Sequence, residues 1–191
     1  FGPLVMSGVT VQNSLVAPNF CGGAVLIASS ASIENSVFQN NTATLGGGAL
    51  CFRSAATETV SVRGTLFFNN LATDAASGFG GGLYLDNVSR VTVIDSVFLS
   101  NRAHLGGAAY VGAAAALTLH GTQTESIFSS RLQLNGNSST EDGGALYNAG
   151  GALAIDGALI SANQTPTQTV LFGHGGAIFS SGTLNLWRSY L

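Results

Sequence analysis

The stretch VIDSVFLSNRAHLGGAAYV, residues 93–111, joins two phrases that return along the chain. The first phrase alternates apolar and polar residues up to an asparagine, and its copies are IENSVFQNN, VRGTLFFNN, VIDSVFLSN and IDGALISAN. The second phrase opens on two glycines, and its copies are GGAVLI, GGALCF, GGLYLD, GGAAYV, GGALYN and GGAIFS. Two phrases repeated in a constant order are the signature of a repeat architecture.

The glycine pairs recur at uneven intervals. They begin at Gly22, Gly47, Gly81, Gly106, Gly143 and Gly175, so successive pairs are 25, 34, 25, 37 and 32 residues apart. The fifth position of the glycine phrase is filled by Leu26, Cys51, Leu85, Tyr110, Tyr147 and Phe179. Because the phrases keep their length while the intervals vary, we expect a constant unit with connections of different length.

Each unit predicts short β-strands. Apolar residues recur at period two, and glycine and β-branched residues are frequent. One unit cannot bury its own apolar columns, but a stack of like units can, with equal residues about 4.8 Å apart. The sequence therefore predicts a right-handed parallel β-helix of about six coils, of pectin-lyase-like type. An antiparallel sandwich also has many short strands, but it does not require the same ordered phrase.

The asparagine that closes the first phrase is predicted to lie inside the coil at a corner. An amide there can bond to backbone groups and to the amides above and below, where water cannot reach. This column consists of Asn41, Asn70, Asn101 and Asn163. The fifth interval is ambiguous, because SIFSSR places Arg131 in the column whereas LQLNGN offers a rival register.

The composition disfavours several classes of function. Only 8% of the 191 residues are charged, against about 25% in ordinary globular proteins, and the net charge is -3 with no lysine. Without a basic patch we expect no binding of nucleic acid. No run of about 18 apolar residues occurs, so we expect no membrane helix. Both ends look cut, and we expect residues 1–191 to be one β-helix segment of a longer chain.

Alternating GGA[ILV] and FxxN phrases resemble those of the polymorphic membrane proteins of chlamydiae and related β-helical repeat proteins. GGA[ILV] is literal in GGAV, GGAL and GGAI, and FxxN is literal in FQNN, FFNN and FLSN. The resemblance covers the chain from about Cys21 onward. It implies a surface-exposed passenger β-helix, on an outer-membrane autotransporter in bacterial members, with adhesion as its role. It also implies an extracellular or cell-surface location and protein or glycan partners at the cell surface. We also expect the cut ends to stack on neighbouring coils or subunits of an assembly.

The sequence predicts no catalytic residue, cofactor or metal ligand, and therefore no enzyme. Enzymes with this fold need carboxylates at equivalent positions of adjacent units, but no acid stacks beside Asp95. The one adjacent acidic pair, Glu141–Asp142, falls in a predicted loop, and the histidines are expected to be ordinary loop residues. The alternative is a carbohydrate-active protein of lyase or hydrolase type, or a sugar-binding one. It would stack sugars on outward aromatic rings, for which the candidates are Tyr84, Tyr110, Tyr147 and Trp187.

Two further expectations concern the cysteines and the loops. Cys21 and Cys51 fall in different columns of neighbouring units, so direct stacking does not bring them together, and a disulfide is left open. Asn87 and Asn137 head sequons in predicted loops and are the better candidates for glycans in a secreted eukaryotic protein. The surface for partners is expected on the loops 71–79, 112–137 and 164–174.

Overall fold

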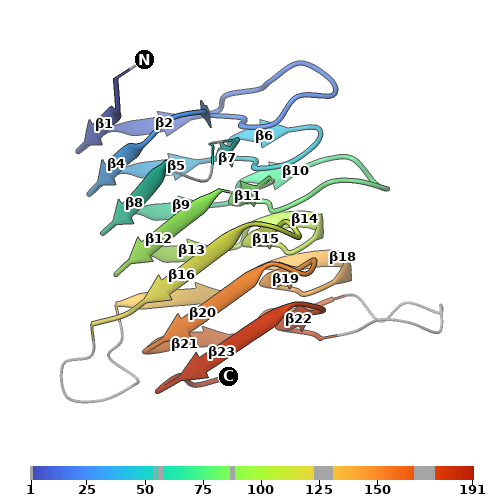
Figure 1. The fold of residues 1–191 in the computed structure, drawn as a ribbon. Coiled ribbons are helices and arrows are strands. Elements are labelled where there is room, and N and C mark those ends of the chain that lie inside the picture. Colours follow the sequence, from blue (N-terminus) through green and yellow to red (C-terminus); the bar gives the residue numbers. More distant parts are fainter. Residues whose placement is uncertain (1, 54, 56–57, 87–88, 123–130, 166–174) are drawn as a thin grey trace.

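The computed structural model describes residues 2–53, 55, 58–86, 89–122, 131–165 and 175–191. These residues form strands and turns without a helix, and the strands make four sheets that we call A to D (Figure 1). The chain runs through A, B, C and D and then returns to A one level further along the stack. Neighbouring strands in every sheet are therefore parallel.

Sheet A has seven strands and sheet B has six. Sheet A contains β1 (Leu4–Ser7), β4 (Ala31–Glu34), β8 (Thr59–Arg63), β12 (Arg90–Ile94), β16 (Ala116–His120), β20 (Ala152–Asp156) and β23 (Thr183–Trp187). Sheet B contains β2 (Thr10–Gln12), β5 (Val37–Gln39), β9 (Leu66–Phe68), β13 (Val97–Leu99), β17 (Leu132–Asn135) and β21 (Ala158–Ser161).

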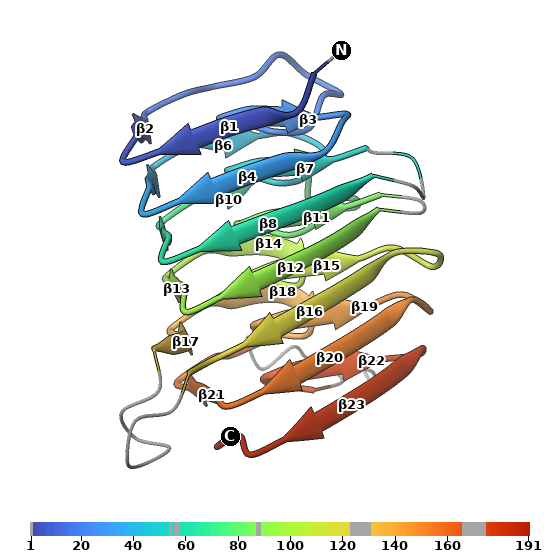
Figure 2. The same ribbon diagram turned by 60° about the vertical axis from the view of Figure 1, so that its left-hand side comes forward.

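Sheet C has the fewest strands, four, and sheet D has six, like sheet B. Sheet C contains β6 (Thr42–Ala43), β10 (Leu71–Ala72), β14 (Arg102–Leu105) and β18 (Ser138–Asp142). Sheet D contains β3 (Val25–Ile27), β7 (Leu50–Phe52), β11 (Leu83–Leu85), β15 (Ala109–Val111), β19 (Leu146–Asn148) and β22 (Ile178–Ser180). The predicted all-β, parallel β-helix class is thus confirmed, and Figure 2 shows its levels from the side of sheet A.

Like residues stack on one another inside the coil. Phe38, Phe67 and Phe98 follow one another in sheet B, with ring centroids 5.5 and 4.7 Å apart and nearly parallel planes. The same column continues in register through Leu134, which pairs with Phe98, and Ile160, which pairs with Leu134. All five side chains are buried. This is the packing of equal residues that the alternating phrase predicts.

The corner between sheets C and D requires a glycine at two successive positions, for a different reason at each. The first glycine of each pair has a positive φ, and a Cβ on Gly80 would lie 1.8 Å from the carbonyl oxygen of Leu83. The second glycine faces the next coil, and a Cβ on Gly48 would lie 2.4 Å from the carbonyl oxygen of Gly81. Glycine removes both clashes, which explains why the phrase needs two of them.

The third glycine pair starts one residue earlier than the sequence predicted. Gly80 has the positive φ of the other first glycines, and Tyr84, rather than Leu85, pairs with Cys51 and Tyr110. Leu85 is fully buried and pairs with Phe52. The run of three glycines at 80–82 concealed this register, because sequence alone does not show which pair turns the chain.

Cys21 and Cys51 form a disulfide bond, with their Cα atoms 5.6 Å apart. Residues in different columns can therefore be neighbours, contrary to the expectation from direct stacking. The glycine corner folds the residues before it against the residues after it, so two columns meet there. Phe79 lies in the column of Cys21 and likewise packs against Tyr84, the neighbour of Cys51.

No helix in the described parts of the chain is long and apolar enough to cross a membrane.

Candidate binding surface

The asparagines at the corner between sheets B and C form one continuous ladder. The side-chain amides of successive rungs hydrogen-bond from Nδ2 to Oδ1 at 2.9–3.0 Å, and the rungs are Asn41, Asn70, Asn101, Asn137 and Asn163. Each Oδ1 from Asn70 onward also accepts the backbone N–H of the preceding rung. Each Nδ2 also donates to a backbone carbonyl one coil back, as from Asn101 to Phe67 at 2.9 Å. The four asparagines predicted for this column all lie in it.

Asn137 is the rung that the sequence prediction assigned to a glycan instead. Its side chain is fully buried, and its Nδ2 donates to the carbonyl oxygen of Phe98 and to Asn163. An amide held in this way cannot carry a glycan in the folded chain, so the expectation for Asn137 is wrong. LQLNGN was the correct register for the fifth interval, since Leu134 follows Phe98 in the core. The other glycan candidate, Asn87, lies outside the described residues.

The ladder leaves no amide free for a partner along its buried length. Asn41, Asn70, Asn101 and Asn137 are fully buried and are bonded through both atoms of the amide. Satisfied polar groups of this kind fix the corner where water cannot reach. The ladder therefore supports the fold, and any binding surface must be sought on the outside of the coil.

The outer face of sheet D carries an aromatic column. Tyr84, Tyr110, Tyr147 and Phe179 occupy successive rungs, and the centroids of adjacent rings lie 4.8–5.5 Å apart. Burial raises the pKa of Tyr84 to about 12 and raises the pKa values of Tyr110 and Tyr147. Because neighbouring rings cover one another's faces, the column offers a sugar mainly ring edges.

A β-bulge in sheet C gathers polar side chains from two coils. Between Ala103 and Leu105 the register shifts, so His104 lies opposite both Thr140 and Glu141. Its Nδ1 is 2.9 Å from Thr140 Oγ1, and its Nε2 is 2.7 Å from Glu141 Oε2. Hydroxyl, imidazole and carboxylate in this order also occur in nucleophile–base sets. Here Thr140 and Glu141 are exposed to water, and the contacts join two coils across the bulge.

Acidic residues do not cluster elsewhere in the described residues. Among them, no group of three or more histidine, cysteine, aspartate or glutamate side chains could hold a metal ion. Asp142 is buried beside the bulge, while the exposed Glu141 lies against His104. His174, the third histidine, lies outside the described residues.

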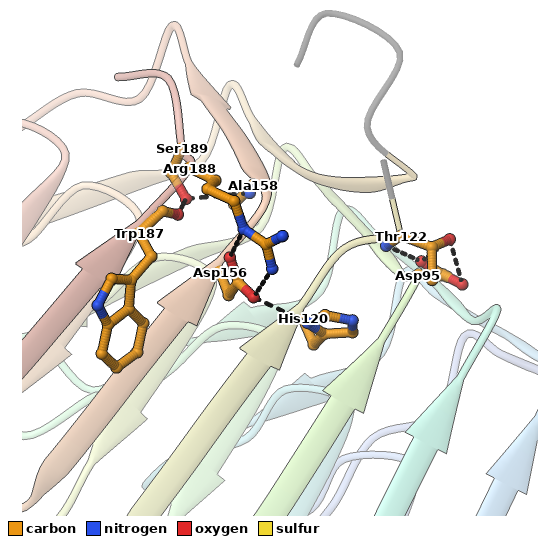
Figure 3. A network of polar contacts seen from close by, with 8 residues as sticks. All are labelled: Asp95, His120, Thr122, Asp156, Ala158, Trp187, Arg188 and Ser189. Carbon is orange, nitrogen blue, oxygen red and sulfur yellow. Dashed lines mark hydrogen bonds and ion pairs between the residues drawn. The ribbon is translucent and has the colours of Figure 1, made fainter. Parts of the chain in front are cut away.

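The edge where sheet A meets sheet B carries a network of polar contacts (Figure 3). Arg188 binds Asp156 with two nitrogens, its Nε donating to Oδ1 at 2.8 Å and its Nη2 to Oδ2. His120 Nδ1 is 3.4 Å from Asp156 Oδ2. The hydrogen bond from Arg188 lowers the pKa of Asp156, and the charges of Arg188 and His120 lower it further.

The network continues toward the other end of the stack. Asp95 accepts hydrogen bonds from the backbone N–H of Thr122 at 2.7 Å and from its hydroxyl at 2.9 Å. Arg63 lies on the other side of Asp95, with Nη2 3.7 Å from Oδ2. The edge is thus a line of paired opposite charges, which the sequence analysis did not predict. An alignment of LHGT (119–122) and LWRS (186–189) with VIDS (93–96) places these residues at the same corner, but it does not show which of them pair.

Parallel coils with one interior ladder, glycine corners and variable connections define a solenoid repeat protein of the parallel β-helix class. The Chlamydia polymorphic membrane protein repeat model matches the chain twice, at residues 35–53 and 131–149. Each match spans a strand of sheet B, a ladder asparagine and the glycine corner that leads into sheet D. These two stretches are therefore repeats similar to those of the Chlamydia polymorphic membrane proteins. No curated protein and no solved structure matches the chain.

Proposed function

We propose that this chain is a non-catalytic, adhesive β-helix module of an extracellular or cell-surface protein, exposing loops to protein or glycan partners. The observation that carries the proposal is that both repeat matches cover the same part of a coil, the strands of sheets B, C and D with the ladder asparagine and the glycine corner. Residues shared by the units are used for corners, core and ladder. Recognition then falls to the parts that differ between units.

The disulfide supports the extracellular part of the proposal. Disulfides persist in oxidising compartments and are rare in the cytosol. Cys21 and Cys51 are both buried, and their bond joins the first two coils where the stack begins.

The connections that lead into sheet D supply the loops. Residues 13–20 and 73–79 extend from the same side of the stack (Figure 1). In the second of them, Asp74 Oδ1 accepts the backbone N–H groups of Ala76 and Ser77, each at 2.8 Å. The predicted loop ranges 71–79 and 112–137 need correction, because they contain strands β10, β16 and β17. The loop 164–174 lies mostly outside the described residues.

A matched loop variant tests the adhesive role. Residues 73–78 are replaced by Thr-Leu, the connection that Thr44 and Leu45 make one coil earlier between equivalent positions. We expect the thermal midpoint to stay within a few degrees of wild type. Beads coated with the wild-type chain should bind cultured cells or matrix-coated surfaces, and beads coated with the variant should bind fewer. Wild-type beads that bind no more than uncoated beads would contradict the proposal.

An enzyme of lyase or hydrolase type is the weaker proposal. Lyases and hydrolases need clustered carboxylates, whereas the described acids are spread along the outer edges and pair with arginine, histidine or backbone groups. Incubation with polygalacturonate tests for lyase activity, and p-nitrophenyl acetate tests the His104 bulge for nucleophilic activity. We expect no turnover above that of a Thr140→Val, His104→Gln variant, and turnover that this variant loses would overturn the non-catalytic role.

A further inference from the structure

A row of outward side chains along the edge of sheet A ends in the only tryptophan of the chain. Strand pairing places His120, Asp156 and Trp187 at equivalent positions of three successive coils. Successive strands of such a sheet lie about 4.8 Å apart. The row therefore presents an imidazole, a carboxylate and an indole at steps close to the length of one sugar ring. In Figure 3 these three side chains follow one another along the edge, with Arg188 beside Asp156.

Trp187 differs from the tyrosines that the sequence analysis also proposed as sugar platforms. Its side chain is on the outer face of the last strand, β23, and is 52% exposed; the core-facing Leu184 and Leu186 of this strand are also 40% and 39% exposed. Tyr84, in the middle of the stack, is 8% exposed and lies between other rings. The indole combines a wide apolar surface with an N–H donor. An exposed indole next to fixed polar groups can pack against the C–H face of a sugar while its neighbours bind the hydroxyl groups.

The polar groups of the row are held in place before any ligand arrives. Two hydrogen bonds from Arg188 fix both oxygens of Asp156, and the same two bonds hold the Arg188 side chain. A carboxylate has about four acceptor positions, so the three contacts from Arg188 and His120 leave one for a ligand. Such preorganisation lowers the entropic cost of binding.

The charges of the row select an uncharged ligand. Asp156 is neutralised by Arg188, and Asp95 lies beside Arg63 in the same network. An anionic sugar would meet the carboxylate of Asp156, and a cation would meet a carboxylate that is already paired. Hydroxyl groups, by contrast, can donate to Asp156 and accept from Arg188.

From this geometry we infer that the row His120, Asp156 and Trp187, with Arg188, is a binding site for a neutral glycan. The inference rests on the proposed function as a surface module and names one class of partner for it. It places the contact on the edge of a sheet, outside the connections 13–20 and 73–79.

The single tryptophan gives a direct readout of binding. The complete chain is titrated with yeast mannan, laminarin, dextran and xyloglucan, and in parallel with the acidic polymers polygalacturonate and heparin. With at least one neutral polymer, we expect the emission of Trp187 to shift to shorter wavelength and its quenching by acrylamide to decrease. Affinity electrophoresis measures the same interaction without relying on fluorescence.

Variants locate the site. Trp187→Ala should weaken binding in affinity electrophoresis about tenfold, and Trp187→Phe should restore part of it, because a ring remains. Asp156→Asn should also weaken binding. Tyr190→Ala is the matched control, since it removes a 46% exposed ring from the same end of the molecule and should leave binding unchanged. Circular dichroism and the thermal midpoint check that each variant is folded.

The outcomes separate this inference from the proposed function. If beads adhere to cells but no neutral polymer binds, the inference is overturned while the adhesive role stands. Binding confined to acidic polymers, or equal binding by wild type and Trp187→Ala, also overturns it. Glycan binding that depends on Trp187 without any adhesion would support the site and contradict the adhesive role.

Discussion

The stack carries two columns of repeated side chains, an inner ladder of amides and an outer column of aromatic rings. The amide ladder consists of asparagine in five successive coils, and only in the first coil does Ser14 take the position, its backbone N–H donating to Asn41 Oδ1 at 3.1 Å. The aromatic column contains leucine, half of a disulfide, three tyrosines and a phenylalanine. The inner column is uniform and the outer one is varied.

The difference follows from what each column must satisfy. A buried corner has backbone N–H and carbonyl groups that need partners at fixed positions, and only an amide of this length both donates and accepts there. On the outside, water can hydrogen-bond to the polar groups. The side chains of the outer column stabilise the stack by packing against one another, which requires contact area but no fixed bond direction. A directional requirement allows one residue type, whereas a requirement for area allows several.

The largest expected effect comes from two single variants in one coil, one that changes the inner column and one that changes the outer column. Asn101→Leu leaves the backbone N–H of Asn70 and the carbonyl of Phe67 without their partners in a buried corner. We expect it to lower the free energy of unfolding by about 4 kcal/mol. Tyr110→Leu keeps an apolar contact and should cost about 1 kcal/mol. Urea unfolding measures both, and equal costs would contradict the distinction.

Glycine substitutions test the close approach of coils on which both columns depend. Gly48→Ala places a Cβ 2.4 Å from the carbonyl oxygen of Gly81 and should cost about 3 kcal/mol, because backbone must move. Gly176→Ala changes the equivalent residue of the last described coil, where nothing lies within 4 Å. We expect it to change the urea midpoint little. A comparable loss in both variants would mean that glycine acts through backbone freedom alone.

How much of this the sequence could predict depends on the same distinction. The inner columns were predictable because direction and space leave one choice, as at Asn41, Asn70 and Gly47. Asn137 was missed because Leu134 replaces the phenylalanine of its phrase and a long interval precedes it. The disulfide and the pairing of Asp156 with Arg188 were missed because they join different positions of neighbouring coils. Such contacts depend on how the corner folds, which a column-by-column alignment does not contain.

Alkaline pH should affect the outer column and spare the inner one. Burial raises the pKa of Tyr84 to about 12, above the ordinary value of 10. The folded chain therefore holds this proton more tightly than the unfolded chain, so stability present below pH 10 should fall as the pH rises toward 12. Unfolding followed by circular dichroism from pH 9 to 12 measures the slope. Tyr84→Phe should reduce the slope, and an unchanged slope would assign it to other groups.

Hydrogen exchange of the asparagine side chains tests the central claim most directly. In NMR spectra of the ¹⁵N-labelled chain, the Nδ2 protons of Asn70, Asn101 and Asn137 should exchange as slowly as the backbone amides of the neighbouring strands. The exposed pair Asn40 and Asn69, joined by a hydrogen bond of 2.8 Å on the outside of the same corner, serves as the control and should exchange fast. Exchange of Asn101 and Asn137 at the rate of this outer pair would contradict an internal ladder.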